Sequence, residues 1–153
     1  MMKKWFLLLP MLLMGGCFFT AYQPTFDYDL VLAPVKSGQL YQVNEFRNES
    51  SSGNRFRLLN ADGLAEGDPY HSWVLSPGEL VARSLNLALN DPDNNGKRTT
   101  VDGRLIAFEV DKSTKVFHLS GFYRKDKTPE VFFDIREPLA DYKPESIVTA
   151  ASM

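Results

Sequence analysis

The chain has 153 residues, of which 44% are hydrophobic and 24% are charged, and its formal net charge is −2. This length suits one domain with a proper core and is too short for two, and the composition excludes a disordered chain. No cluster of Lys and Arg interleaves with aromatic residues, so we expect no nucleic-acid partner.

The amino terminus has the pattern of a bacterial lipoprotein signal. A basic segment, Met1–Lys4, precedes the apolar run Trp5–Met14, which is well short of the ~20 residues that span a bilayer. Small residues and a cysteine follow, and Leu13–Cys17 resembles the lipobox, in which small residues precede a lipidated cysteine. We therefore predict cleavage between Gly16 and Cys17 and a covalent lipid on Cys17.

Cys17 is the only cysteine, so it has no partner for an intramolecular disulfide. Acylation would remove a free thiol from the oxidising periplasm. By resemblance to lipoproteins, Cys17 carries three acyl chains, which anchor a protein far more firmly than one chain does. Phe18 stands where many lipoproteins retained in the inner membrane have Asp, which favours an outer-membrane anchor facing the periplasm. The alternative is that Cys17 is only a small residue of an ordinary signal peptide.

The chain therefore divides into a signal peptide (1–16), a lipidated tether (17–27) without clear periodicity, and a periplasmic domain (28–153). The first part of that domain is predicted to contain three strands, over Asp29–Val35, Leu40–Phe46 and Arg55–Leu59. The next stretch, Asn60–Pro69, is rich in turn formers and is predicted to be a loop.

A helix over Ser76–Asn90 is the clearest element. Ser76 suits the N-cap, Pro77 suits the first helical position, and Glu79 completes a capping box. The apolar residues spread over more than half of the helix circumference. The remaining polar edge consists of Arg83, Asn86 and Asn90. Such a wide apolar arc predicts a sheet on one side of the helix and another covering element on its flank.

The second half of the domain predicts an antiparallel meander. Strands are expected over Arg104–Asp111, Lys115–Arg124 and Glu130–Arg136, joined by connections of hairpin length. Pro144 then begins a short C-terminal helix. The predicted fold is α+β, with one main helix (76–90) and a short C-terminal helix packed on one face of a mostly antiparallel sheet.

Aromatic residues and then a proline precede the main helix, and leucines recur regularly along it. The residues of this pattern are Tyr70, Trp73, Pro77, Leu80 or Val81, Leu85 and Leu89. With the strands before the helix and the return strand Leu105–Val110, this pattern resembles the ABC-type transport auxiliary lipoprotein family, the PqiC-like proteins. The resemblance covers roughly Asp29 to Ala151 and contains no catalytic signature. It departs from the family in two features, a shorter C-terminal helix and the acidic, Asn-rich turn Asp91–Gly96.

The resemblance implies a non-enzymatic, outer-membrane-anchored accessory subunit of an MCE/ABC-type intermembrane lipid transport system. The subunit would tether or dock the MCE-domain protein, with a homo-oligomer as a further option. The alternative is a periplasm-facing lipoprotein that regulates cell-wall synthesis or secretion-pore assembly. The predicted partner contacts are Tyr70, Trp73, Leu80 and Leu87. For Tyr70 and Trp73, a position in the core is the competing interpretation.

Two further sets of residues are weighed for chemistry. Asp91, Asp93, Asn95 and Asp102 occupy positions one, three, five and twelve of a calcium-loop pattern. A strand is predicted after this segment where a calcium loop has a helix, and the alternative is a solvated turn, so we expect no metal site. His71 and His118 lack any accompanying nucleophile motif or metal-ligand spacing, so we expect no enzymatic activity and no cofactor beyond the lipid.

Overall fold

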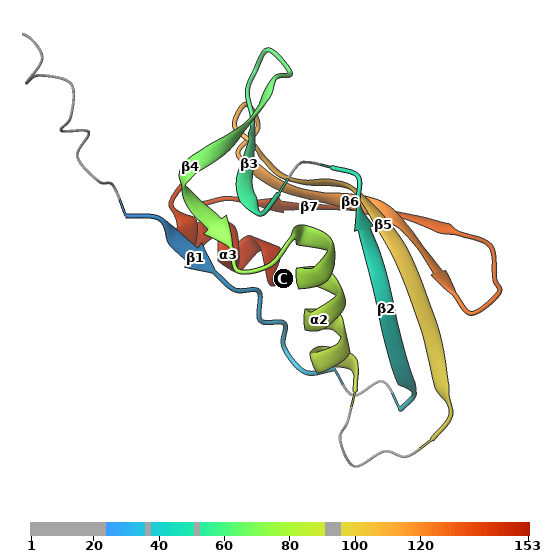
Figure 1. Cartoon of the computed structure of the whole chain (residues 1–153). Helices are drawn as coiled ribbons and strands as arrows, with labels where there is room; N and C mark the ends of the chain where they lie inside the picture. The colour runs from blue at the N-terminus through green and yellow to red at the C-terminus, as the bar shows by residue number, and fades with distance from the viewer. Residues whose placement is uncertain (1–23, 36–37, 51–52, 91–95) are drawn as a thin grey trace, which may run out of the picture.

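The computed structural model describes residues 24–35, 38–50, 53–90 and 96–153. As predicted, these ranges form an α+β domain with one main helix and a short C-terminal helix. Figure 1 shows α2 lying alongside β2 within the bend of the sheet, with α3 on the same side. The elements in chain order are β1 (Phe26–Tyr28), β2 (Leu40–Asn48), β3 (Arg55–Leu59), β4 (Ala65–Trp73), α2 (Pro77–Leu89), β5 (Arg98–Asp111), β6 (Val116–Lys125), β7 (Val131–Pro138) and α3 (Pro144–Ala151). Neither helix has the length and apolar character required to cross a membrane.

The strands form one mixed sheet in the order β1-β4-β3-β5-β6-β7, with β2 also paired to β5. The β5–β6–β7 meander is antiparallel, as predicted. One edge of β5 is shared by two strands, since β2 runs parallel to its first part and β3 pairs in parallel with Val110 and Asp111. β1 is likewise parallel to β4. Periodicity in a sequence assigns a strand to a face but not to a neighbour, so these parallel pairings were not predicted.

Two predictions about individual elements are wrong, and two element boundaries differ from those predicted. Asp29–Val35 is not a strand but an extended segment beside α2, where the Val35 N–H donates to the Ala88 carbonyl at 2.8 Å. The predicted loop Asn60–Pro69 contains the start of β4. The strand accommodates the Gly-Asp-Pro sequence there because its register against β3 shifts between Arg55 and Arg57. β5 begins well before the predicted Arg104, and β1 takes in the last two residues of the predicted tether.

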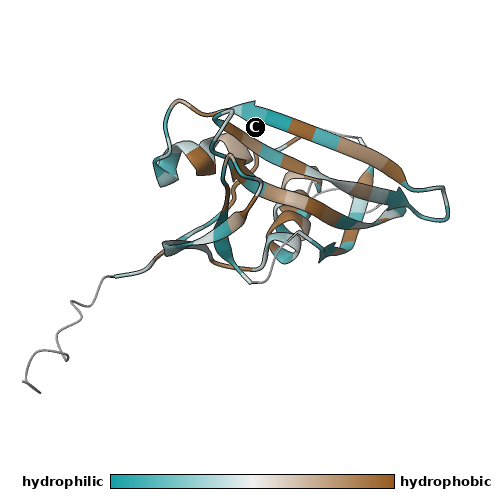
Figure 2. Cartoon of the chain, turned by 90° about the horizontal axis from the view of Figure 1, so that it is seen from above, coloured by the Kyte–Doolittle hydropathy of each residue, from teal (hydrophilic) through white to brown (hydrophobic). Residues whose placement is uncertain are grey.

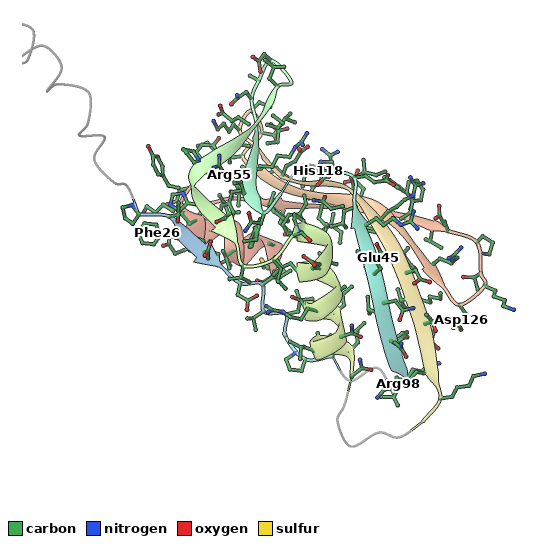
Figure 3. The ribbon with its side chains drawn as sticks, in the orientation of Figure 1. Phe26, Glu45, Arg55, Arg98, His118 and Asp126 are labelled. Atoms are coloured by element: carbon green, nitrogen blue, oxygen red, sulfur yellow. The ribbon has the colours of Figure 1, made fainter. Side chains whose placement is uncertain are left out.

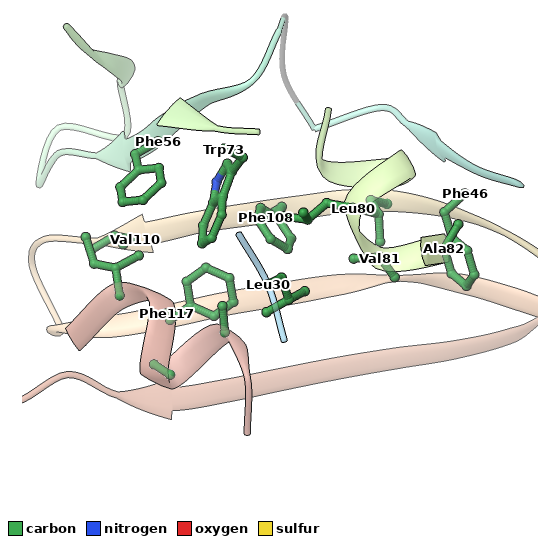
Figure 4. Close-up of a cluster of buried hydrophobic side chains, with 14 of the residues drawn as sticks. Leu30, Phe46, Phe56, Trp73, Leu80, Val81, Ala82, Phe108, Val110 and Phe117 are labelled. Carbon is green, nitrogen blue, oxygen red and sulfur yellow. The ribbon is translucent and has the colours of Figure 1, made fainter. Parts of the chain in front are cut away.

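The core is an aromatic cluster between the sheet and the two helices (Figure 4). The Trp73 ring packs against Phe56 with a centroid distance of 4.4 Å and meets Phe108 edge-on at 5.3 Å. Phe108 in turn meets Phe117 at 5.2 Å with perpendicular rings. The buried cluster named from the described residues lies between Leu30 and Ala151. A chain that lacks the predicted signal peptide therefore retains this core.

Candidate functional site

The amino end of α2 is fixed against β2 by a close backbone approach. A Cβ atom at Gly78 would lie 1.8 Å from the Phe46 carbonyl oxygen, so only glycine fits. The Glu79 carboxylate accepts hydrogen bonds from the Ser76 hydroxyl at 2.6 Å and from the Ser76 N–H at 3.2 Å. These bonds lower the pKa of Glu79. The bond from the Ser76 N–H to Glu79 is the one that the predicted capping box requires, and the two bonds together fix the start of the helix at Ser76.

The polar edge of α2 covers the free backbone edge of β2. The Val43 N–H donates to the Asn86 side-chain oxygen at 2.9 Å, and the Asn86 amide donates to the Val43 carbonyl at 2.7 Å. One turn later, Asn90 accepts the Tyr41 N–H at 2.9 Å and donates to the Asn86 carbonyl at 2.9 Å. The two asparagines thus replace a neighbouring strand and satisfy an edge that would otherwise be open to pairing.

The extended segment after β1 covers one flank of α2. The buried Ser84 hydroxyl donates to the Leu30 carbonyl at 2.8 Å, and Arg83 forms an ion pair with Asp29. Between segment and helix lies a shallow hollow of about 220 Å³ whose lining includes Val31 and Leu87. Both side chains are largely exposed, as is the nearby Val35. We refer to Val31, Val35 and Leu87 as the outer α2 surface.

The other flank of α2 opens onto an apolar groove between the helix and the inner face of the meander. Its volume is about 520 Å³, which is in the range of roughly 300–1,000 Å³ found for small-molecule sites. α3 reaches the groove only with its last residues. The groove is lined chiefly by Leu85 and Leu89 of α2, Leu119 and Tyr123 of β6, and Phe133 and Ile135 of β7. This is the flank for which the wide apolar arc predicted a covering element.

One ammonium group lies at the edge of this groove. The Lys125 Nζ is 5.9 Å from the centroid of the Tyr41 ring and 5.8 Å from that of Tyr123. All three side chains line the groove, and no other charged side chain is among the described residues that do. Within the described part of the chain, Lys125 forms no ion pair. Sequence reasoning missed Lys125, although strand alternation places it on the same face as Leu119 and Tyr123.

The outer face of the sheet carries paired charges. Arg104 lies 3.2 Å from Glu49 and 3.5 Å from Glu130, and its guanidinium stacks on the Phe122 ring at 4.4 Å. Figure 3 shows the side chains in place, with Glu45 labelled on β2, and Figure 2 shows hydrophobic and hydrophilic residues interleaved along the meander. Exposed ion pairs of this kind contribute little and mark a solvated face.

His71 has a structural environment on β4. Its ring lies near those of Phe26, Tyr28 and Phe56, at centroid distances of 6.1, 5.9 and 6.2 Å. The Nδ1 atom is 3.0 Å from an Asp68 carboxylate oxygen, an ion-pair distance without hydrogen-bond alignment. Partial burial raises the pKa of Asp68, but backbone hydrogen bonds and the His71 ring lower it by more. By accepting the Tyr70 and His71 N–H groups, Asp68 stabilises the part of β4 in which the register against β3 shifts.

His118 lies on β6, with its Nε2 3.0 Å from the Asp134 carboxylate of β7. Figure 3 labels this residue. A hydrogen bond from Arg136, with further contributions from its charge and from His118, holds the pKa of Asp134 below its usual range. This is a cross-strand ion-pair network.

The predicted site residues are distributed as follows. Trp73 and Leu80 are buried and therefore are not accessible to a partner, because both belong to the hydrophobic core, where the Trp73 ring packs against Phe56 and Phe108. Tyr70 and Leu87 are exposed, on different elements. Gly16, Cys17, Asp91, Asp93 and Asn95 lie outside the described residues. Asp102 is in β5, where it accepts a hydrogen bond from Asn44 at 3.2 Å. No acidic or histidine cluster suited to a metal occurs within the described ranges.

Comparison with protein-family models gives no match, and no curated protein matches the chain. Solved structures show a similar fold. One, described as an uncharacterized protein, has a TM-score of 0.67 at 11% identity and covers 84% of this chain and 90% of its own. Another, protein XCC0632 from Xanthomonas campestris of the family-model DUF330, has a TM-score of 0.58 at 10% identity and covers 84% and 85%. At these identities the likeness establishes the fold alone.

Proposed function

We propose that the protein is a lipid-anchored, non-enzymatic docking subunit of an MCE/ABC-type intermembrane lipid transport system, held at the periplasmic face of the outer membrane through Cys17. The observation that carries the proposal is the outer α2 surface. Three aliphatic side chains are exposed there, Leu87 on a helix that is fixed to the sheet and Val31 and Val35 on the extended segment beside it. Exposed apolar residues on a rigid element are typical of protein–protein contacts.

The length of the amino-terminal segment is consistent with action close to a membrane. Eight residues lie between Cys17 and Phe26, the first residue of β1, so nine residue-to-residue steps join the two. A chain of that length spans at most ~32 Å when fully extended, at about 3.5 Å per residue. A lipid on Cys17 would therefore keep the domain within about one domain diameter of the bilayer. A partner that crosses the periplasm would meet the domain there.

The proposal predicts which surface recruits the partner. An affinity-tagged protein should capture an MCE-domain protein from envelope membranes after gentle crosslinking, and Leu87→Glu should abolish the capture. Leu64→Glu is the matched control, because Leu64 is 67% exposed and Leu87 is 71% exposed, and Leu64 lies in the turn between β3 and β4. If the wild-type protein captures no MCE-domain protein, the proposal is wrong. Recovery of a cell-wall synthase or a secretion-pore component instead would favour the alternative function.

A further inference from the structure

We propose that the apolar groove beside α2 binds the hydrocarbon chain of a single-chain anionic amphiphile, whose carboxylate or phosphate is held by Lys125. This site is separate from the outer α2 surface, so the inference does not rest on the proposed docking function. The shared ligand chemistry is one acyl chain with one anionic headgroup, as in a fatty acid or a lysophospholipid.

The groove provides the apolar part of such a site. Val81, Leu85 and Leu89 are spaced four residues apart and form one ridge of α2, which runs for about 12 Å at 1.5 Å per residue. The opposite wall is the inner face of β6 and β7, including Phe133 and Ile135. These residues leave apolar surface exposed to water, and an alkyl chain that covers it is favoured by the hydrophobic effect.

Lys125 provides the polar part. Its side chain is exposed and lines the groove, and its ammonium group lies within 6 Å of two tyrosine rings, at 5.9 Å from Tyr41 and 5.8 Å from Tyr123, where cation–π attraction favours a position at the groove mouth. An ammonium ion that forms no ion pair with the described residues, next to a long apolar surface, matches an amphiphile whose charge is negative. The Tyr123 hydroxyl adds a hydrogen-bond donor among the lining residues, whereas the Tyr41 hydroxyl donates to the Gln39 side-chain oxygen at 3.1 Å.

A protein partner suits the groove less well. Protein interfaces combine an apolar centre with a polar rim that makes many hydrogen bonds. Here the described side chains that line the groove include only three with a polar group, Lys125, Tyr41 and Tyr123. A few convergent polar groups in a mostly apolar cavity are instead typical of a small-molecule site.

The test uses residues 17–153 with Cys17→Ser, so that the protein carries no lipid of its own. Cis-parinaric acid, a fluorescent fatty acid, is titrated against the delipidated protein, and palmitate, a lysophospholipid with an anionic headgroup, and hexadecanol are used as competitors. We expect saturable binding. In a series of shorter fatty acids, the Kd should fall two- to fourfold for each added methylene, and the fourfold value corresponds to a methylene that is fully buried in the groove. Stronger competition by palmitate than by the lysophospholipid would identify a carboxylate headgroup, and the reverse order a phosphate.

Two variants locate the ligand. Ile135→Glu should weaken parinarate binding at least tenfold, whereas Ile106→Glu should leave it unchanged. The two residues are 43% and 44% exposed, but only Ile135 lines the groove. Lys125→Met should weaken binding of palmitate and leave that of hexadecanol unaffected.

Absence of saturable binding by the wild-type chain would overturn the inference, as would equal losses in the two isoleucine variants. Equal competition by palmitate and hexadecanol would overturn the assignment of the headgroup to Lys125. If an MCE-domain protein that binds through Leu87 displaced parinarate, the groove and the outer α2 surface would not be separate sites, which would also contradict the inference. Because capture of the MCE-domain protein is measured with Leu87→Glu and fatty-acid binding with Ile135→Glu, failure of one proposal is distinguishable from failure of the other.

Discussion

Replacing Asn86 by alanine removes the side chain that completes the edge of β2. Both of its hydrogen bonds to Val43 are lost, each contributing about 0.5–1.5 kcal/mol net, and a partly buried N–H and carbonyl are left without a partner. We therefore expect Asn86→Ala to lower the free energy of unfolding by about 2–3 kcal/mol. With a urea m-value of about 2 kcal/mol/M, the unfolding midpoint falls by about 1–1.5 M. Asn90→Ala, which frees only the Tyr41 N–H of β2, should cost about 1 kcal/mol.

The measurement is urea unfolding of residues 17–153 followed by Trp73 fluorescence. Trp73 is buried, and the other tryptophan, Trp5, precedes this segment, so the signal reports the core. Asn44→Ala is the matched control, because Asn44 is an exposed asparagine of β2 whose substitution should cost less than about 0.5 kcal/mol. Hydrogen exchange of the Val43 amide should accelerate in Asn86→Ala and not in the control. Equal stability of the two variants, with unchanged exchange at Val43, would refute the role assigned to Asn86.

Three further predictions follow from individual contacts. Gly78→Ala should destabilise the protein by roughly 1–3 kcal/mol in thermal or urea unfolding, because the alanine Cβ would collide with the Phe46 carbonyl. A stabilising effect, as expected for Ala in an unconstrained helix, would contradict the close approach of α2 to β2 at this position. Hydrogen bonds from Ser113–Thr114 lower the pKa of Asp111 from 3.8 to about 2, so its ionised form stabilises the fold above pH 3.8 and this contribution is lost as the pH falls towards 2. Asp111→Asn should flatten the acid limb of stability measured by urea unfolding at a series of pH values, and an unchanged limb would exclude this carboxylate. Radioactive palmitate should label the wild-type chain but not Cys17→Ala, and persistent labelling would rule out the lipid anchor at that residue.

The main helix and the meander could be predicted because their signals are local. Ser76, Pro77 and Glu79 define the start of α2 within four consecutive residues, and period-two alternation marks β6 and β7. The parallel partners of β5 depend on residues distant in sequence, so alternation alone did not reveal them. The extended segment after β1 buries Leu30 beside α2 but leaves Val31 and Val35 exposed, so its continuous apolar run imitates the pattern of a buried strand.

The candidate site was only partly predictable for a related reason. Asn86 and Asn90 form a polar edge in the sequence, and a polar edge usually faces water. Only the tertiary structure shows that it faces the backbone of β2. The apolar arc predicted a covering element on the flank of α2. The sequence does not show that the segment with Leu30 covers one flank, whereas the other opens onto a groove with Lys125 at its edge.

Site-specific photo-crosslinking in cells tests the docking role most directly. A photoreactive phenylalanine analogue placed at Leu87 should form an adduct with an MCE-domain protein, identified by mass spectrometry. The same analogue at Phe132, exposed on β7, provides the comparison position. The account predicts an MCE adduct from position 87 and none from position 132. No adduct at 87, or an MCE adduct from 132 alone, would contradict the claim that the outer α2 surface is the docking site.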